Sequence, residues 1–586
     1  MYEILNRINS PDDVKKLSIA QLNELASDIR EALFNRLTKI GGHCGPNFGI
    51  VEMTIALHYV FNSPVDKFVF DVSHQTYPHK MLTGRKNGYI VDAEFKNDSG
   101  YSNPEESDHD LFNVGHTSTS ISLASGLAKA RDILGGSENV IAIIGDGSLS
   151  GGEALEGLNV VGSEIKGNMI IIVNDNQQSI SETHGGIYKN LELLRNTDGK
   201  AQNNMFKAIG LDYIYEQNGN DIATLIELFK KIKDIDHPIV VHINTQKGKG
   251  YKQAEINKEA WHWCMPFDRE TGKPKFTFSG ETYPSIAKNF IMSVAKSNEK
   301  VVVVTPNMPS SFGLTISDRE SLGERFVDVG IAEEQAVAMA SGIAKRGGKP
   351  ILITNTTFMQ RTYDQVSQDL CINDNPVTIL LNYANFDGLT DVTHLGIFGI
   401  SLFSNIPNLI LLAPSSKEEL LDMLDYSVNK STHPTMILLP GNDVVSRKPI
   451  LPIEKINEYE ITEQGSEVSI IALGDFYQKG EELYNRLKDE LGITATLVNP
   501  RNASILDEKT LSGLLENHKL VITLEDGVLD GGFGEKIARF FGDKNILVKN
   551  FGLQKKFYDR YNPEELLIEL GMDMNSLVEY VKNTLK

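Results

Sequence analysis

Short runs of β-branched and aliphatic residues recur along the chain, and they constrain its fold more than any other feature. Examples are Val140–Ile144, Met169–Val173, Val301–Val304, Val377–Leu381, Leu409–Leu412 and Val468–Ala472. Runs without polar alternation suit strands that are buried on both faces, as in parallel sheets covered by helices. Amphipathic stretches such as Leu123–Leu134 and Ala336–Lys345 precede further runs at 140 and 350. The alternation predicts an α/β fold with mostly parallel sheets.

The length of the chain predicts several domains rather than one. A chain of 586 residues exceeds what a single hydrophobic core accommodates. Two polar segments, Asp268–Tyr283 and Ser446–Tyr459, separate blocks of strand and helix patterns. We therefore expect three consecutive α/β domains near residues 1–275, 280–450 and 455–586.

Charge and cysteine content exclude several classes of protein. A formal net charge of −21 disfavours nucleic acid and anionic membrane surfaces as partners, because both require clustered Lys and Arg. The N-terminal residues lack the apolar segment of a signal peptide, and no apolar run has the length of a membrane helix. Cys44, Cys264 and Cys371 are too scattered for a disulfide framework. We expect a cytoplasmic protein that acts on small molecules.

Polar residues follow two of the predicted strands at the point where each strand ends. Gly145-Asp146-Gly147 follows the run at 140, and Asn174-Asp-Asn176 follows the run at 169. The carboxyl ends of parallel strands are where open α/β sheets bind ligands. Asp146, the Asn176 amide oxygen and a main-chain carbonyl near Gln178 would suit Mg²⁺, and the glycines would let a diphosphate approach. A plain turn explains the tripeptide alone, but the second strand with its asparagines favours a metal–diphosphate site.

Longer motifs extend along nearly the whole chain. They are Gly41–Val60, Asp71–Arg85, Gly115–Ser122, Asp328–Glu333, Phe358–Val366, Asn499–Arg501 and Gly531–Gly534. Together with the Gly-Asp-Gly and Asn pattern, these segments resemble thiamine-diphosphate enzymes of the transketolase type. Within that group the chain is most similar to the 1-deoxy-D-xylulose-5-phosphate synthase family.

The resemblance implies a fold, an assembly and a reaction. It implies a transketolase-like homodimer whose three domains bind the diphosphate, bind the pyrimidine and form a C-terminal unit. Thiamine diphosphate, held with Mg²⁺, would serve as electron sink. In this family pyruvate loses CO₂ and its remaining carbons join glyceraldehyde 3-phosphate. Two alternatives stay open: a related carboligation (ketol transfer or acyloin formation with a different, unphosphorylated aldehyde), and a scaffold without catalysis.

The resemblance also implies roles for individual residues. Glu333 would exchange a proton with the pyrimidine ring from an apolar pocket that raises its pKa, and Phe358 would stack on that ring. The resemblance also predicts cofactor contacts from His74, Gly115, His116, Thr117, Asp146, Gly147, Ser148, Asn176, Lys247 and Tyr251. It predicts catalytic or substrate contacts from His43, His74, His262, Arg361, Asp387 and His394. Taken singly, these residues also suit ordinary roles, as a helix-start glutamate, a core aromatic, a basic turn or structural histidines.

The chain departs from the family pattern where an acceptor phosphate would bind. Asp387-Gly-Leu-Thr is followed by Asp391-Val-Thr, which delays the histidine to His394, and Ala332-Glu-Glu-Gln335 replaces Ala-Glu-Gln-His. The family arginine before Asp-Gly is missing from Leu380–Phe386, and Tyr-Pro-Arg-Gly becomes Leu438-Leu-Pro-Gly441. By resemblance the two missing arginines would grip the phosphate. Either other cations replace them, or the acceptor is a different aldehyde.

Overall fold

The computed structural model describes residues 2–276 and 280–586. These residues form two compact units. The first contains the chain up to Ser279 together with Gly330–Ala332, and the second contains Gly280–Val329 and Glu333–Lys586. Within the described residues, no helix is both long enough and apolar enough to span a membrane.

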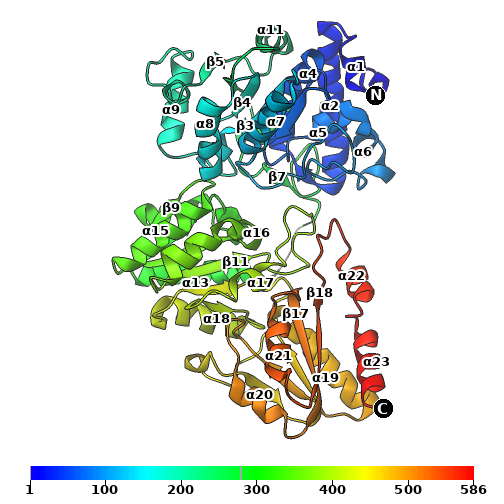
Figure 1. Cartoon of the computed structure of the whole chain (residues 1–586), viewed down its shortest axis with the longest axis vertical. Helices are drawn as coiled ribbons and strands as arrows, with labels where there is room; N and C mark the ends of the chain where they lie inside the picture. Colours follow the sequence, from blue (N-terminus) through cyan, green and yellow to red (C-terminus); the bar gives the residue numbers. More distant parts are fainter. Residues whose placement is uncertain (1, 277–279) are drawn as a thin grey trace. The chain divides into compact units, whose positions relative to one another are not determined.

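The first unit is built on a five-stranded parallel sheet of order β2-β3-β4-β6-β5 (Figure 1). Its strands are β2 (Lys67–Phe70), β3 (Val140–Gly145), β4 (Met169–Asp175), β5 (Asp212–Glu216) and β6 (Ile239–Asn244). The predicted runs at 140 and 169 are thus neighbouring central strands, paired so that Gly145 lies opposite Asn174. The carboxyl ends of β3 and β4 therefore lie next to each other.

Both faces of this sheet are buried, as the apolar runs predicted. Ile141 and Ile143 of β3 pack into a core with α2 (Ile19–Ile40), α4 (Val51–Val60) and α11 (Ile222–Ile232). The alternate residues Ala142 and Ile144 pack into a second core with α7 (Ser120–Leu134) and α8 (Gly152–Glu164). The predicted helix at 123–134 is α7, and the structure adds three residues at its start.

Shorter elements complete the first unit. The helices are α1 (Pro11–Val14), α3 (Gly45–Gly49), α5 (Tyr77–Lys80), α6 (Asn87–Ile90), α9 (Gly186–Asn196), α10 (Met205–Ala208) and α12 (Lys252–Ile256). Strands β1 (Gly42–His43) and β7 (Trp263–Cys264) form a small antiparallel pair. This pair brings the segment around His43 next to the segment around residue 263, although they are far apart in sequence.

The second unit contains two sheets. The first is parallel, with order β12-β13-β11-β10-β8-β9, and the second has order β14-β16-β15-β17-β18. The first sheet consists of β8 (Val301–Thr305), β9 (Phe326–Asp328), β10 (Lys349–Asn355), β11 (Thr378–Asn382), β12 (Ile410–Leu412) and β13 (Thr435–Leu438). The second consists of β14 (Glu460–Glu463), β15 (Glu467–Ala472), β16 (Thr496–Asn499), β17 (His518–Val528) and β18 (Leu547–Leu553). Only the edge strand β14 runs antiparallel within these two sheets.

Helices surround both sheets of the second unit (Figure 1). They are α13 (Tyr283–Ser297), α14 (Ile316–Leu322), α15 (Glu333–Lys345), α16 (Thr356–Met359), α17 (Gly399–Phe403), α18 (Lys417–Asp425), α19 (Tyr477–Leu491), α20 (Glu508–Leu514), α21 (Phe533–Phe541), α22 (Pro563–Glu569) and α23 (Met574–Thr584). One hydrophobic core contains Ile379 and Leu411 of the first sheet together with Ile471 and Val521 of the second. The two sheets are therefore parts of one packed body.

We predict that the alternating burial of the central strands dominates the stability of the first unit. Ile171 of β4 is fully buried, whereas Ile133 of α7 is 74% exposed. Ile171→Ala should lower the free energy of unfolding by about 2–5 kcal/mol through lost burial and a cavity, and Ile133→Ala should change it by no more than about 0.5 kcal/mol. Urea unfolding followed by circular dichroism measures both. Equal midpoints for the two variants would contradict this burial pattern.

Candidate active site

The ends of β3 and β4 bring two predicted metal ligands together. Asp146 follows β3 directly and is 1% exposed, and Asn176 follows β4. The Asn176 backbone lies close enough to the Asp146 carboxyl group to lower its pKa, against the larger effect of burial. The two side chains therefore share one corner of the sheet edge, as the sequence predicted.

Two oxygen atoms at this corner lack a partner within the protein. Asp146 Oδ2 and Asn176 Oδ1 are buried and accept no hydrogen bond from any described residue. Buried oxygen atoms are almost always satisfied, because leaving one unpaired costs about 1–3 kcal/mol. Carboxylate and amide oxygens are ligands that Mg²⁺ accepts. The corner therefore fits a bound cation.

The charges around Asp146 are set by burial. Burial, assisted by repulsion from Asp175, raises the pKa of Asp146 to about 8. Burial also lowers the pKa of Lys247 to about 7, although the Asp146 carboxylate opposes this shift. A bound dication would oppose the rise in the Asp146 pKa, because it favours the charged carboxylate.

Asp175 holds the strand end that carries Asn176. Its Oδ2 accepts a hydrogen bond from His242 Nε2 at 2.8 Å and forms an ion pair with Arg195, and its Oδ1 accepts from the Gln177 N–H at 3.1 Å. Burial alone would raise the pKa of Asp175, but His242 and Arg195 outweigh it and hold the pKa below its ordinary value. The segment after β4 is thereby fixed by charge-assisted bonds.

The segment after β3 leaves no room for a side chain at Gly147. A Cβ atom on Gly147 would lie 2.7 Å from the Ser179 side chain. The Gly147 carbonyl accepts a hydrogen bond from the Tyr188 hydroxyl at 3.1 Å, and the Ser148 carbonyl accepts one from the Ser118 hydroxyl at 2.7 Å. The predicted phosphate-binding segment at 147–148 is therefore packed closely against its neighbours.

Ser118 connects this segment to the Gly115-His116-Thr117 loop. Asp71, which is 1% exposed, accepts hydrogen bonds from the N–H groups of Ser118 at 2.8 Å and Ser120 at 3.1 Å. The carboxylate thus fixes the loop ahead of α7. The structure places the loop and the Gly147 turn side by side through Ser118.

Three of the predicted histidines form one cluster. The ring centroids of His43 and His74 are 5.0 Å apart, those of His74 and His262 are 5.2 Å apart, and those of His43 and His262 are 5.8 Å apart. Asn47 donates hydrogen bonds to the carbonyls of both His43 and His74, each at 2.8 Å. Burial, followed by the Lys247 charge, lowers the pKa of His262 well below its ordinary value.

Lys247 links the histidine cluster to the strand corner. Its ammonium group donates to the Ser179 carbonyl and lies 3.1 Å from His262 Nδ1. Ser179 is the residue that packs against Gly147. A cationic side chain, imidazoles and unpaired oxygens therefore line one polar region, which suits an anionic ligand with a metal.

Two predicted residues occupy different surroundings. The Tyr251 ring lies among Phe34, Trp261 and Phe267, with its hydroxyl donating to the Arg269 carbonyl at 3.3 Å. Tyr251 is therefore part of the hydrophobic core, and its contact with a cofactor stays a prediction. The Gln178 side chain donates to the Ile180 carbonyl at 3.2 Å, and the predicted metal contact from its main chain also stays a prediction.

The second unit carries the remaining predicted residues. Glu333 begins α15, is 3% exposed and lies 3.7 Å from an Arg361 guanidinium nitrogen. Burial raises the pKa of Glu333 to about 7 although Arg361 opposes the shift, so this carboxyl group exchanges protons near neutral pH. The Phe358 ring, on α16, lies 5.7 Å from the His394 ring, and burial lowers the pKa of His394 to about 4.

Comparison with known proteins identifies the family. Residues 5–202 and 197–245 match the model described as 1-deoxy-D-xylulose-5-phosphate synthase. Residues 282–445 match the transketolase pyrimidine-binding domain, and residues 457–577 match the transketolase C-terminal domain. The 1-deoxy-D-xylulose-5-phosphate synthases of Caldanaerobacter subterraneus and Alkaliphilus oremlandii are each 38% identical to this chain over 99% of its length. The matched regions include 98% and 99%, respectively, of those two proteins. The chain belongs to the 1-deoxy-D-xylulose-5-phosphate synthase family.

A further relative shows the same extent of similarity. The 1-deoxy-D-xylulose-5-phosphate synthase of Clostridium acetobutylicum is 36% identical, with 99% of each chain covered. The similarity to this synthase family thus extends through both structural units. The chain is accordingly an enzyme of the transferase class, with an α/β fold of the transketolase type.

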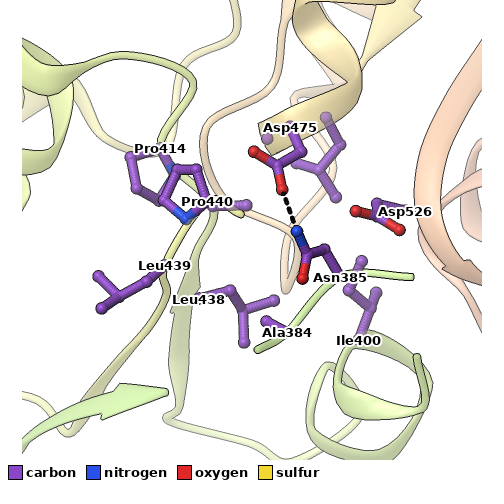
Figure 2. A pocket seen from close by; sticks show the side chains of 12 residues that line it. Ala384, Asn385, Ile400, Pro414, Leu438, Leu439, Pro440, Asp475 and Asp526 are labelled. Carbon is purple, nitrogen blue, oxygen red and sulfur yellow. Dashed lines mark hydrogen bonds between the residues drawn. The ribbon is translucent and has the colours of Figure 1, made fainter. Parts of the chain in front are cut away.

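This synthase-family chain has an acidic cavity where the sequence lacks an arginine. Asp475 and Asp526 line the cavity together with Asn385 and Pro440 (Figure 2). A Cβ atom on Gly441 would lie 1.4 Å from Asn385 Nδ2, so a side chain at that position would displace Asn385. The Leu438–Gly441 segment therefore packs against an asparagine and two carboxylates.

Several residues that build these sites were not predicted from the sequence. Asp71 lies in the Asp71–Arg85 motif and Asp175 lies between Asn174 and Asn176. An acidic residue in such a position is a signal that could have identified both. Asn385, Asp475 and Asp526 come from three separate segments. Only the fold brings them together, so no local pattern points to them.

We predict that metal binding at Asp146 requires release of a proton. Because the carboxyl pKa is raised to about 8, the group is largely protonated at pH 6, and a metal must replace that proton. Affinity for Mg²⁺ in the presence of thiamine diphosphate should therefore rise from pH 6 to 8, by up to about tenfold per pH unit. Calorimetry in buffers of different ionisation enthalpy measures the affinity and the released proton.

The exposed Asp198→Asn variant is the matched control and should keep this pH dependence, whereas Asp146→Asn should lose most of the affinity. Binding that is independent of pH in the unmodified protein would show that Asp146 does not ligate the metal.

Proposed function

We propose that this chain is a thiamine-diphosphate- and Mg²⁺-dependent carboligase that joins carbons from pyruvate to an aldehyde, with 1-deoxy-D-xylulose 5-phosphate formation as the reference reaction. The observation that carries this proposal is the pair of buried, unpartnered oxygens on Asp146 and Asn176 at adjacent strand ends. Family membership adds the expectation of the reaction class. When bound, the cofactor would supply an electron sink next to the donor carbonyl.

The residues of the first unit would bind the metal and the diphosphate. Asp146 and Asn176 would hold the metal, and Gly147, Ser148 and the loop at 115–117 would face the diphosphate. Lys247 would add positive charge beside it, because its ammonium group lies at the Ser179 carbonyl next to Gly147. His43, His74 and His262, clustered within 6 Å of one another by ring centroid, would face the reacting groups.

Glu333 would hold and return a proton at the cofactor's pyrimidine ring. Its burial supplies the raised pKa that such an exchange needs near neutral pH. Arg361, 3.7 Å away, would keep the carboxylate oriented and could meet a donor carboxylate. Phe358 would pack on the ring, with His394 beside it.

We predict that Glu333→Gln separates binding from catalysis. Glutamine keeps the size of the side chain but cannot exchange the proton, so turnover should fall by about 10²–10⁴-fold, with cofactor affinity kept within about an order of magnitude. Steady-state kinetics and calorimetry measure the two effects. The neighbouring Glu334→Gln variant removes a charge without removing the buried carboxyl group and should retain most of the activity. Normal turnover by Glu333→Gln would refute this role for Glu333.

A second candidate function differs in the acceptor. Asp475 and Asp526, two buried carboxylates, line the cavity at Pro440, where the family pattern has an arginine. Carboxylates repel a phosphate rather than bind it. Each charge-assisted hydrogen bond to a charged group contributes about 1.5–3 kcal/mol, so loss of two arginines would weaken a phosphorylated acceptor several hundredfold. This favours transketolase-like ketol transfer or acyloin formation with an unphosphorylated aldehyde.

We predict that the acceptor's phosphate contributes little to catalysis. With pyruvate as donor, kcat/KM for glyceraldehyde 3-phosphate should exceed that for unphosphorylated glyceraldehyde by less than about 100-fold, because the two arginines are absent. Mass spectrometry of the products from a donor–acceptor panel provides the test. Saturation by glyceraldehyde 3-phosphate at micromolar concentration, with a far larger ratio, would establish the synthase reaction and reject the second candidate.

Two further expectations belong to this proposal. We propose that the chain acts as a homodimer, as its family resemblance implies. The presence of Asp146, Asn176 and Glu333 argues against a scaffold without catalysis, because the two carboxyl groups and the Asn176 Oδ1 atom would be costly to bury without a ligand or a proton to exchange.

A further inference from the structure

A small cavity lies between the two sheets of the second unit, apart from Glu333 and Phe358. Its volume is about 30 Å³, which is enough for at least one water molecule, and the cavity is partly open to solvent. Most of its lining residues lie at or just after the carboxyl ends of β11, β12, β13 and β15, while Asp526 lies late in β17 and Ile400 lies in α17. The carboxyl ends of parallel strands are the usual position of ligand sites in α/β sheets.

The polar atoms that line this cavity are mostly hydrogen-bond acceptors. Asp475 Oδ2 accepts from the Gly441 N–H at 2.8 Å and from Asn385 Nδ2 at 3.1 Å, the bond drawn in Figure 2. Asp526 Oδ1 accepts from the Phe386 N–H at 2.9 Å. Asp475 Oδ1 and Asn385 Oδ1 have no partner among the residues that the structure describes, although Asn385 is 2% exposed and Asp475 is 8% exposed. Two buried acceptors thus require a donor or a cation.

No Lys or Arg is among the described residues that line the cavity. Burial raises the pKa of Asp475 to about 6, and burial followed by repulsion from Asp475 raises the pKa of Asp526 well above its ordinary value. Asp387 increases the repulsion on both carboxylates, and Lys479 opposes it at Asp526. Burial, followed by repulsion from Asp526 and Asp387, also raises the pKa of Tyr561. The surroundings therefore favour positive charge or a shared proton.

We propose that this cavity binds a small monovalent cation, held by the oxygens of Asp475, Asn385 and Asp526. Potassium and ammonium ions are close in size to a water molecule and accept ligands of irregular number and geometry. Mg²⁺ is disfavoured, because it demands a near-ideal octahedron of ligands, and among the described residues only Asp475 and Asn385 offer this cavity a buried oxygen without a partner. The described residues also contain no group of three or more His, Cys, Asp or Glu that could hold a metal.

The bound cation would join the two sheets. Asn385 and Gly441 follow β11 and β13 of the first sheet, whereas Asp475 and Asp526 belong to the second. Neutralising the carboxylates in place would remove a repulsion that now opposes their packing. The inference concerns the stability of the second unit and assumes no particular reaction, but a bound cation would offset the repulsion of a phosphate on which the second candidate function rests.

Thermal unfolding at constant ionic strength tests this proposal. Tetramethylammonium chloride, whose methyl groups keep its charge away from oxygen ligands, is replaced stepwise by potassium, ammonium, methylammonium, sodium or magnesium chloride at pH 7.5. The unfolding midpoint should rise saturably, by about 2–4 °C, with at least one small monovalent cation. A response to potassium or ammonium indicates a free ion, and a response to methylammonium alone indicates the amine end of an organic ligand.

Two variants show whether the response comes from this cavity. Asp475→Asn should abolish the rise, whereas Asp530→Asn, which removes an exposed carboxylate in the loop after β17, should retain it. A midpoint that is the same in every salt would mean that the carboxylates share only a proton, and would overturn the proposal.

A crystallographic measurement covers the case in which Asp475→Asn does not fold. Crystals of the unmodified protein soaked in thallium(I) acetate should show an anomalous peak beside the unpaired Oδ1 atoms of Asp475 or Asn385, because thallium(I) replaces potassium. Absence of a peak in an otherwise occupied crystal would also overturn the proposal.

Discussion

The proposed function depends on one constraint: oxygen atoms that are buried at the ends of parallel strands need a hydrogen-bond donor or a cation. Asp146 Oδ2 and Asn176 Oδ1 have none among the described residues. Taking a carboxylate out of water costs several kcal/mol unless it is paired or neutralised. A protein that retains such a carboxylate, with its pKa raised to about 8, keeps an unfavourable arrangement that a bound cation would relieve.

The surrounding structure fixes these atoms rather than satisfying them. Asp175 is held by His242 and Arg195, and it in turn fixes the turn that carries Asn176. Asp71 fixes the loop at 115–118 through the Ser118 N–H. Rigid neighbours reduce the reorganisation that ligand binding needs, which is how preorganised sites gain affinity. The same principle applies to Asn47, which fixes the backbone of His43 and His74.

Sequence patterns predicted the strands well and the long-range contacts poorly. The apolar runs at 140 and 169 became central strands because only sheets buried on both faces use such runs. Asp146 and Asn176 could be paired in advance, since neighbouring parallel strands end at the same edge. The antiparallel edge strand β14 could not, because its direction depends on the path of the preceding loop. The family resemblance predicted a cofactor contact for Tyr251, but its aromatic surroundings include Phe34, which is distant in sequence.

A crystal structure with thiamine diphosphate and Mg²⁺ tests the central claim most directly. We predict a metal about 2.0–2.1 Å from Asp146 Oδ2 and Asn176 Oδ1, with phosphate oxygens completing its coordination. A coenzyme bound elsewhere, or those two oxygens left without a metal at saturating concentrations, would contradict it.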